Sequence, residues 1–238
     1  MNHTDPNVTI VIPIYNEEAI LHASVIDLID RLKQFDRSYE LILAENGSTD
    51  RTVTIARELV ERFAQLRLFS IGQPNYGKAL QKGIQEAKGV YVFCDEIDLC
   101  DTDFYARALQ ILDSNQADFV VGSKVISGAS DERPLVRRAG TLVINSLLRI
   151  LLGFRGTDTH GLKAFRRQKL LDVANACIVD KDLFASEFVI RAERQSINIL
   201  EIPVTVLEKR APSTHLFRRV PNVLRNLAKL VVAIRIKK

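Results

Sequence analysis

The feature that most constrains this chain is the alternation, along its first half, of short apolar runs with stretches of helical periodicity. The apolar runs are rich in β-branched residues and cover residues 8–14, 41–44, 66–70, 90–94 and 117–121. The helical stretches cover residues 19–34, 52–63, 78–87 and 104–114, and we expect Asp50 and Asp103 to cap two of these helices. Strands that are apolar throughout are typical of a sheet buried on both faces. The order of elements therefore predicts an α/β fold, with a mostly parallel sheet flanked by helices.

The pattern changes after Gly122. Residues 126–138 are polar and are expected to form a loop, and residues 141–154 form an unusually apolar helix. That helix contains Arg149 and is shorter than the roughly 20 apolar residues that span a bilayer. A helix near residues 184–194 and a strand at residues 197–206 are expected to follow. We predict one domain over residues 1–215 and a basic amphipathic helix over residues 216–238.

The composition excludes several classes of protein. The chain has 238 residues, 47% hydrophobic and 26% charged, as in an ordinary globular protein and unlike a disordered chain. Its three cysteines form no Cys-x-x-Cys pair, which disfavours a disulfide scaffold and a zinc site and indicates a reducing compartment. The N-terminus has no basic segment leading into an apolar stretch, so no signal peptide is expected. These observations together predict a cytoplasmic location.

Charge is distributed unevenly along the chain. Residues 209–238 contain nine of the 33 lysines and arginines and none of the 29 acidic residues, so the rest of the chain has a net charge of about −5. A basic tail on an acidic body indicates an anionic partner, such as a membrane surface, nucleic acid or phosphates, although a solvated basic helix is the alternative. The tail contains one aromatic residue, Phe217, so nucleic acid, which is often bound by base stacking, is not the expected partner.

Four polar clusters follow or lie between the predicted strands. They are PIYNEE at residues 13–18, ENGSTD at residues 45–50, Gly77-Lys78 at the start of a helix, and DEID at residues 95–98. The carboxyl ends of parallel strands meet at one edge of a sheet, and open α/β sheets bind their ligands there. The clusters therefore predict a polar binding site at this edge.

The order of these clusters resembles that of the family 2 glycosyltransferases, which have the GT-A fold. The resemblance covers nearly the whole chain, in the stretches VTIVIPIYNEE, ELILAENGSTDRT, NYGKALQKGIQEAKGVYVFCDEIDL, ADFVVGSK, DTHGLKAFRR, SEFVIRAER and ILEIPVTVLEKRAPS. Within the family, the chain is most similar to the dolichyl- or polyprenyl-phosphate sugar synthases. The resemblance implies an inverting transfer of a sugar from a nucleotide-diphosphate donor to a polyprenyl phosphate. Two alternatives stay open: an acceptor hydroxyl on a glycan or small molecule, and a non-catalytic domain that binds nucleotide sugars.

The resemblance also implies which residues bind the donor. Those expected around the nucleoside are Pro13, Tyr15, Glu17, Glu45 and Asn46, and those expected near the phosphates are Lys78, Lys124 and Arg210. Glu45 and Asn46 would reach the base, where family members commonly have two aspartates, so the choice of base stays open. A solvated Lys78 and a surface Lys124 are the alternatives for these two cations.

A divalent cation, Mg²⁺ or Mn²⁺, is implied between the two phosphates, where it stabilises the charge of the leaving diphosphate. The family's Asp-x-Asp motif aligns with Glu96-Ile97-Asp98, so Glu96 and Asp98 are the expected metal ligands, and Asp98 is the better supported. Asp95 is expected to point to the other face, because successive strand residues alternate. Cys100 occupies a position that is often Gln, and Asp101 could compensate for it.

The acceptor decides whether a general base is needed. A lipid phosphate is already ionised near neutral pH, whereas a hydroxyl must give its proton to a carboxylate. The resemblance places two candidate catalytic carboxylates on the acceptor side, Asp158 and Glu187. The alternative for Glu187 is an i, i+4 ion pair with Arg191 on one helix, and the alternative for His160 is a role in a turn.

Two predicted helices that are apolar and also carry basic residues bear on the identity of the acceptor. In the lipid-phosphate synthases, amphipathic helices lie on the membrane, and residues 141–154 and 220–236 have the required character. A core helix and an oligomer interface are the competing interpretations. We expect peripheral attachment to an anionic membrane surface on the cytoplasmic side.

Overall fold

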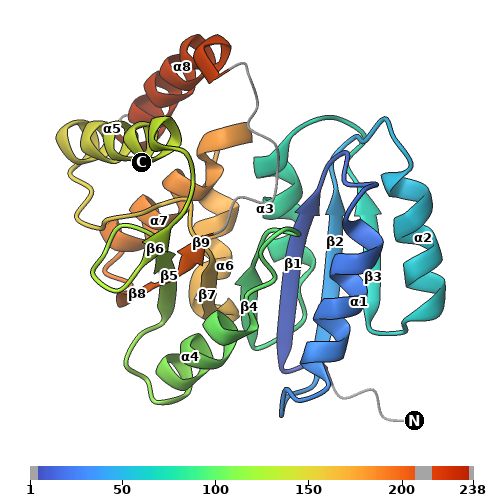
Figure 1. Ribbon diagram of the computed structural model, residues 1–238. Helices are drawn as coiled ribbons and strands as arrows, with labels where there is room; N and C mark the ends of the chain where they lie inside the picture. Colours follow the sequence, from blue (N-terminus) through green and yellow to red (C-terminus); the bar gives the residue numbers. More distant parts are fainter. Residues whose placement is uncertain (1–4, 207–215, 236–238) are drawn as a thin grey trace.

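The computed structural model of the chain describes residues 5–206 and 216–235 (Figure 1). A seven-stranded sheet with the order β3-β2-β1-β4-β7-β5-β8 forms its centre. The strands of this sheet are β1 (Val8–Ile14), β2 (Tyr39–Glu45), β3 (Leu66–Ser70), β4 (Tyr91–Cys94), β5 (Phe119–Ser123), β7 (Lys163–Arg166) and β8 (Ile199–Pro203). A second, two-stranded sheet pairs β6 (Ser130–Asp131) with β9 (Thr205–Val206). The predicted α/β class with a mostly parallel sheet is confirmed.

One strand of the large sheet departs from the parallel pattern. β7 runs antiparallel to both of its neighbours, β4 and β5, whereas the other neighbouring pairs are parallel. The parallel register sets Ile14 beside Glu45 and Val11 beside Cys94. The carboxyl ends of β1, β2, β4 and β5 therefore meet at one edge of the sheet. Because β7 runs in the opposite direction, the amino end of β7, at Lys163, lies at this edge.

Helices cover both faces of the sheet. The α-helices are α1 (Leu21–Leu32), α2 (Thr52–Arg62), α3 (Tyr76–Glu86), α4 (Thr102–Asp113), α5 (Leu135–Leu152), α6 (Arg167–Ala176), α7 (Phe184–Arg194) and α8 (Leu216–Arg235), and η1 (Lys181–Leu183) is a 3₁₀-helix. α1, α2 and α4 bury their apolar sides in one core, and α3, α5, α6, α7 and α8 bury theirs in the other. All seven residues of β1 are buried between these layers, which explains why its sequence shows no polar alternation.

Three local expectations differ from the structure. Asp101, not Asp103, caps α4, because its side chain accepts a hydrogen bond from the amide of Phe104 at 2.9 Å. Asp50 lies one residue before the N-cap of α2, Arg51, although its carboxylate does accept from the amide of Thr52 at 2.9 Å. The stretch expected to be a loop over residues 126–138 contains β6 and the first turn of α5.

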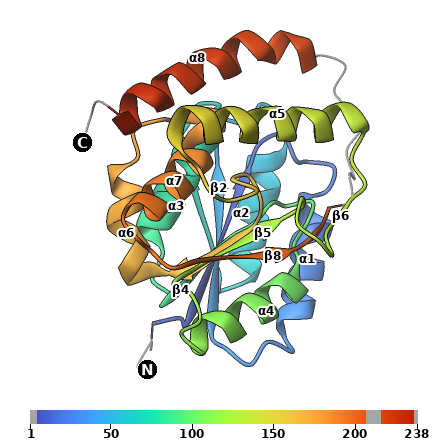
Figure 2. The ribbon, with the colours of Figure 1, turned by 90° about the vertical axis from the view of Figure 1, so that its left-hand side faces the viewer.

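α5 and α8 lie side by side at one end of the molecule (Figure 2). The inner face of α8 is part of the second core, since Leu227, Leu230 and Ala233 are buried there. Arg191 and Arg194 of α7 donate to the carbonyl oxygens of Ala233 and Ile234 and hold the end of α8 in place. Among the described helices, none combines the length and the hydropathy needed to cross a membrane.

Candidate active site

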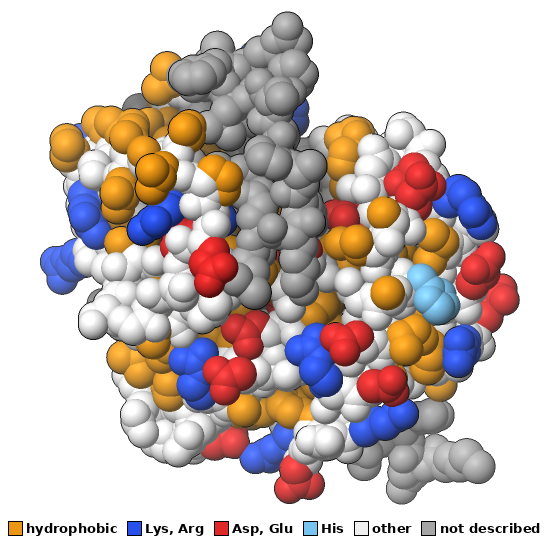
Figure 3. All heavy atoms as spheres, in the orientation of Figure 1, with side chains coloured by type: hydrophobic (Ala, Val, Ile, Leu, Met, Phe, Trp, Pro, Cys, Tyr) orange, Lys and Arg blue, Asp and Glu red, His pale blue; other side chains and the backbone are white. Residues whose placement is uncertain are grey.

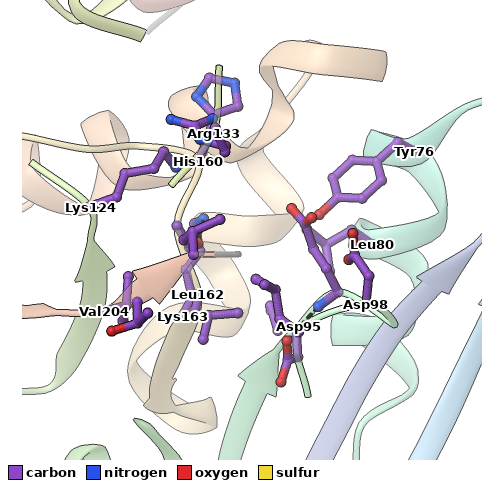
Figure 4. A pocket seen from close by; sticks show the side chains of 16 residues that line it. Tyr76, Leu80, Asp95, Asp98, Lys124, Arg133, His160, Leu162, Lys163 and Val204 are labelled. Carbon is purple, nitrogen blue, oxygen red and sulfur yellow. Dashed lines mark hydrogen bonds between the residues drawn. The ribbon is translucent and has the colours of Figure 1, made fainter. Parts of the chain in front are cut away.

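A cavity of about 180 Å³ opens where β4, β5 and β7 meet the edge of the sheet (Figure 4). One wall is acidic and comes from the segment after β4, with Asp95, Glu96 and Asp98, and Tyr76 of α3 stands beside it. The opposite wall is basic and contains Lys124, Arg133 and His160, with Lys163 at the base of the cavity. The polar edge that the sequence predicted is therefore a cavity with walls of opposite charge.

The segment after β4 holds its shape through Asp95. Its carboxylate accepts hydrogen bonds from the amides of Glu96 and Asp101, at 2.6 and 3.1 Å, and from the hydroxyl of Tyr105. Burial of this carboxyl raises its pKa to about 7, an effect that the hydrogen bond from Tyr105 partly offsets. Asp95 thus borders the cavity, but its carboxylate is turned toward its own loop and Tyr105 of α4, which agrees with the expectation that it points away from Glu96 and Asp98.

Glu96 and Asp98 both line the cavity, whereas Ile97 between them is 1% exposed and packs into the first core. Asp101 is engaged as the cap of α4, so its carboxylate serves the helix and not the expected compensation for Cys100. Cys100 has a left-handed backbone (φ 48°), and its Sγ donates to the carbonyl of Ile97 at 3.5 Å. The motif therefore presents two carboxylates to the cavity on a tightly turned loop.

The two carboxylates suit a metal ion that is shared with a substrate. The described residues contain no group of three or more His, Cys, Asp and Glu side chains that could hold a metal by themselves. Mg²⁺ and similar hard cations are commonly bound by one or two carboxylates, with substrate phosphates and water completing the coordination. Glu96 and Asp98 fit that pattern, and a bound diphosphate would have to supply the remaining ligands.

Lys124 and Asp158 form a buried ion pair in the basic wall. The Lys124 Nζ lies 2.9 Å from an oxygen of Asp158, and the two side chains are 7% and 0% exposed. Asp158 also accepts from the amide of His160 at 2.9 Å. Burial disfavours its carboxylate, but the charge of Lys124 and this hydrogen bond outweigh burial and hold the pKa of Asp158 below its ordinary value. Asp158 therefore lies beside Lys124 of the cavity wall, and its lowered pKa makes its carboxylate a weak proton acceptor.

This ion pair should make the protein sensitive to acid. A carboxyl whose pKa is lowered by folding stabilises the folded state fully above its ordinary pKa of 3.8, and that contribution is lost as the pH falls through the lower folded value. We expect the free energy of unfolding in urea to fall below about pH 4 more steeply for the wild type than for Asp158→Asn. Equal pH slopes for the two proteins would show that Asp158 keeps an ordinary pKa in the folded state.

Two cations of the cavity were not among the predicted site residues. Arg133 forms a two-pronged ion pair with Asp131, with its Nε and Nη2 at 2.8 and 2.7 Å from the two carboxylate oxygens. Lys163 is 3% exposed, and its Nζ donates to the carbonyl of Gly161 at 2.7 Å. Burial lowers the pKa of Lys163 to about 8. A lysine inside the otherwise apolar run LKAF was the signal in the sequence, because strands buried on both faces rarely contain one without a reason.

Glu187 lies apart from the cavity. One of its oxygens accepts from the amides of Ile178 and Val179 at 2.9 and 2.6 Å, and the other accepts from the Nε of Arg191 at 2.7 Å. The side chain is fully buried in α7 and is not among the residues that line the cavity. The ion pair with Arg191, which was the alternative interpretation, is the arrangement observed. The geometry thus corrects the catalytic assignment of Glu187, which stabilises the segment before η1.

The residues expected around the nucleoside lie at the ends of β1 and β2. Tyr15 is 41% exposed beyond β1, and the amide of Glu17 donates to the hydroxyl of Thr52 at 2.7 Å. Asn46 is buried, and its side-chain nitrogen donates to the carbonyl of Ile14 at 3.0 Å, next to the buried Pro13. These contacts hold the loops after the two strands together at the sheet edge.

Glu45 is already engaged within this group. Its two carboxylate oxygens accept from the amide of Ser48 and the hydroxyl of Ser70, and the residue is 1% exposed. Gly47 has a left-handed backbone (φ 82°), and a Cβ there would lie 2.7 Å from the backbone of Gln73. The structure therefore assigns Glu45 to shaping the loop, which differs from the expected contact with the base.

The remaining predicted cations lie elsewhere. Lys78 is exposed on the first turn of α3, where its amide donates to the side chain of Asn75 at 3.0 Å, and its side chain is not among those that line the cavity. The tyrosine two residues before it, Tyr76, lines the cavity instead. Arg210 lies outside the described residues.

Several glycosyltransferases are similar in sequence to this chain. A glycosyltransferase named AglD from Haloferax volcanii is 26% identical over 202 residues, which cover 83% of this chain and 32% of that protein. A dolichyl-phosphate β-glucosyltransferase, ALG5D, from Trichomonas vaginalis is 27% identical over 214 residues, which cover 83% of this chain and 64% of the relative. An undecaprenyl-phosphate 4-deoxy-4-formamido-L-arabinose transferase from Photorhabdus laumondii is 29% identical over 164 residues, which cover 67% and 49%. The chain thus spans about one third to two thirds of these curated relatives.

Solved structures confirm the fold. Glucosyl-3-phosphoglycerate synthase from Mycobacterium tuberculosis, in complex with phosphoglyceric acid, superposes with a TM-score of 0.68 at 21% identity, over 98% of this chain and 81% of that one. Such a likeness confirms the GT-A fold. The sequence profile described as "Glycosyl transferase family 2" matches residues 9–173, which is more than half of the chain. This chain therefore belongs to glycosyl transferase family 2.

Proposed function

We propose that the protein is an inverting glycosyltransferase that moves a sugar from a nucleotide-diphosphate donor to a polyprenyl phosphate. The observation that carries the proposal is the cavity in which Glu96 and Asp98 face Lys124, Arg133 and Lys163. One wall suits a metal-bound diphosphate, and the other suits a second anionic substrate. A sugar held between them is placed for direct displacement at its anomeric carbon.

The acidic wall would bind the donor through a metal. The M. tuberculosis synthase has been solved in complex with Mn²⁺ and uridine diphosphate, and it shares the fold of this chain. In our protein, Glu96 and Asp98 would hold the ion, which supplies positive charge to the departing diphosphate. Tyr15 and Asn46, at the ends of β1 and β2, would contact the nucleoside.

The carboxylates support a phosphate acceptor over a hydroxyl. A hydroxyl nucleophile needs a carboxylate that can take its proton. The ion pair with Lys124 lowers the pKa of Asp158 and makes its carboxylate a weak base, and Glu187 is fully buried away from the cavity. A phosphate is already ionised and needs only positive charge to position it. The names of two relatives, which specify dolichyl phosphate and undecaprenyl phosphate, support the same class of acceptor.

An apolar stripe on α5 supports attachment to a membrane surface. Leu135, Val136, Leu142, Val143 and Ile150 are 76%, 58%, 54%, 58% and 77% exposed. Their spacing places them on one face of the helix, where Figure 3 shows apolar side chains gathered. Arg138 and Arg149, both exposed on the same helix, could pair with anionic headgroups. We infer that α5 lies on the cytoplasmic surface of a membrane and brings the cavity close to a lipid-linked acceptor.

Substituting this stripe should weaken membrane binding without unfolding the protein. The triple variant Leu142→Ser, Val143→Ser, Ile150→Ser removes exposed apolar side chains that a membrane would bury, so we expect at least about a tenfold loss of binding to anionic vesicles. Cosedimentation with phosphatidylserine-containing vesicles measures this loss. Val90→Ser is the matched control, because Val90 is 54% exposed and lies on a different part of the surface. Unchanged binding by the triple variant would contradict the assignment.

The proposed activity is tested with donors first and acceptors second. Thermal shifts with UDP-, GDP- and dTDP-sugars, each with and without Mn²⁺ or Mg²⁺, should show one metal-dependent stabilisation, because ligand binding to the folded state raises its melting temperature. The sugar of that donor should then move to a short-chain polyprenyl phosphate, with inversion at the anomeric carbon. Binding of a donor without turnover would favour a non-catalytic domain, and transfer to a glycan hydroxyl alone would refute the phosphate acceptor.

A further inference from the structure

Lys163 is a buried cation at the centre of the site. It is the first residue of β7, and its neighbours across the sheet are Cys94 of β4 and Val121 of β5. This register places it between the loop that carries Glu96 and the end of the strand that leads to Lys124 (Figure 4). Lys163 is 3% exposed and still lines the cavity. Its amine is therefore withdrawn from bulk water but accessible from the cavity.

Lys163 differs from the neighbouring cations in its partners. Lys124 is neutralised by Asp158 at 2.9 Å, and Arg133 is neutralised by Asp131 at 2.7 Å. Within the described part of the chain, no carboxylate lies at ion-pair distance from the Nζ of Lys163, which bonds to the carbonyl oxygen of Gly161. Among the three cations, Lys163 is therefore the one whose ammonium group has no direct carboxylate partner in the described residues and can bind an anion that enters the cavity.

The chemistry of a buried ammonium group also indicates that Lys163 binds an anion. The group has three N–H donors, and one carbonyl oxygen uses one of them. Burying a charge without a counter-ion costs free energy, which is why burial lowers the pKa of Lys163 to about 8. Such a cost is retained most readily where a bound ligand reverses it, as at binding and catalytic sites.

We propose that Lys163 is a phosphate-binding residue of the cavity, and that its ammonium group donates to a non-bridging oxygen of a substrate phosphate. The donor's β-phosphate and the acceptor's phosphate both have non-bridging oxygens that can accept from the ammonium group. The identity of these two substrates rests on the proposed function. Both must come within reach of the cavity centre when the sugar is transferred between them.

The test is calorimetric titration of four proteins with two kinds of probe. The proteins are wild type, Lys163→Met, Lys163→Arg and the control Lys82→Met, since the side chain of Lys82 on α3 is 43% exposed and does not line the cavity. Inorganic phosphate and pyrophosphate, the latter with Mn²⁺, test anion binding without reference to sugar transfer. UDP and GDP with Mn²⁺ then represent the donor, and a short-chain isoprenyl phosphate represents the acceptor.

We expect Lys163→Met to weaken phosphate or pyrophosphate binding by about 10- to 100-fold, the range of a hydrogen bond to a charged group. Lys163→Arg should recover part of that affinity, and Lys82→Met should match the wild type. The melting temperature of Lys163→Met should be no lower than that of the wild type, because the substitution removes a buried charge that makes no direct ion pair with a described residue. A loss for the nucleoside diphosphates assigns the contact to the donor, and a loss for the isoprenyl phosphate assigns it to the acceptor.

Affinities within twofold of the wild type for every probe would overturn the proposal. So would a loss of affinity that accompanies a lower melting temperature and is not recovered in Lys163→Arg, because Lys163 would then be structural. A wild type that binds none of the probes would refute both this proposal and the proposed function. If pyrophosphate binding depends on Lys163 but no sugar is transferred, the proposed function fails and this proposal stands.

Discussion

Asp98→Ala should abolish metal-dependent sugar transfer while leaving the fold intact. Asp98 is one of two carboxylates that face the cavity from the segment after β4, and the metal they would hold stabilises charge on the leaving diphosphate. Losing several kcal/mol of that stabilisation lowers kcat/KM by about 10³-fold or more. Transfer of radiolabelled sugar at saturating Mn²⁺ measures the effect, and calorimetry should show that Mn²⁺ no longer strengthens nucleotide binding.

The matched control for this variant is Asp103→Ala. Asp103 lies close in sequence, on the first turn of α4, but its side chain is 78% exposed and pairs with Arg107. We expect Asp103→Ala to retain activity within about twofold, because a surface ion pair contributes little. Full turnover by Asp98→Ala would remove the metal assignment, and equal losses in both variants would indicate a general defect of this segment.

Lys124→Met should cause the largest loss of stability. The substitution keeps the length of the side chain but leaves the carboxylate of Asp158, which is fully buried, without its counter-ion. Breaking a buried ion pair by removing one partner costs about 3–5 kcal/mol in the free energy of unfolding. Urea denaturation followed by circular dichroism measures this loss.

A control variant and a double variant separate this effect from simple loss of charge. Arg37 and Asp113 form an ion pair of 2.8 Å at the surface, with side chains 43% and 37% exposed. Arg37→Met should therefore lower the free energy of unfolding by at most about 1 kcal/mol.

The double variant Asp158→Asn, Lys124→Met should lose less free energy of unfolding than the sum of the two single variants, because the second substitution removes the charge that the first leaves unpaired. Additive losses would show that the two side chains do not interact.

Local sequence predicted most of the first half of the fold. The bounds of β1 and β3 agree with the apolar runs, because strands buried on both faces show no competing pattern. The direction of β7 could not be predicted in this way, since it depends on which strands it separates and not on its own residues. α6 was not predicted either, and its composition gives only a weak apolar face, with Leu170, Val173 and Ala174 buried.

The candidate site was predicted in part. Glu96, Asp98 and Lys124 come together in the cavity, because all three follow strands that end at the same edge. Glu187 was misplaced because sequence alone does not show that the amides of Ile178 and Val179 bind its carboxylate, although the ion pair with Arg191 was the open alternative. Arg133 was missed because it lies in a polar segment between β6 and α5 that carries no pattern of its own, and Lys163 was missed although a lysine in the apolar run LKAF marked its position.

The position of β7 also has a consequence for how the chain is made. β4 and β5 both pair with β7, which follows them in the sequence, so neither strand has its full set of neighbours until Lys163–Arg166 has left the ribosome. Until then β4 has one unpaired edge and β5 has neither of its neighbours, since β8 follows β7 in the sequence, and unpaired apolar strands are sites of aggregation. Pairing of β7 with both strands links β5 to the rest of the sheet, and it also brings Lys163 between the walls of the cavity. The cavity is therefore assembled late, because β7 and the lining residues that follow β8 are both made after β4 and β5.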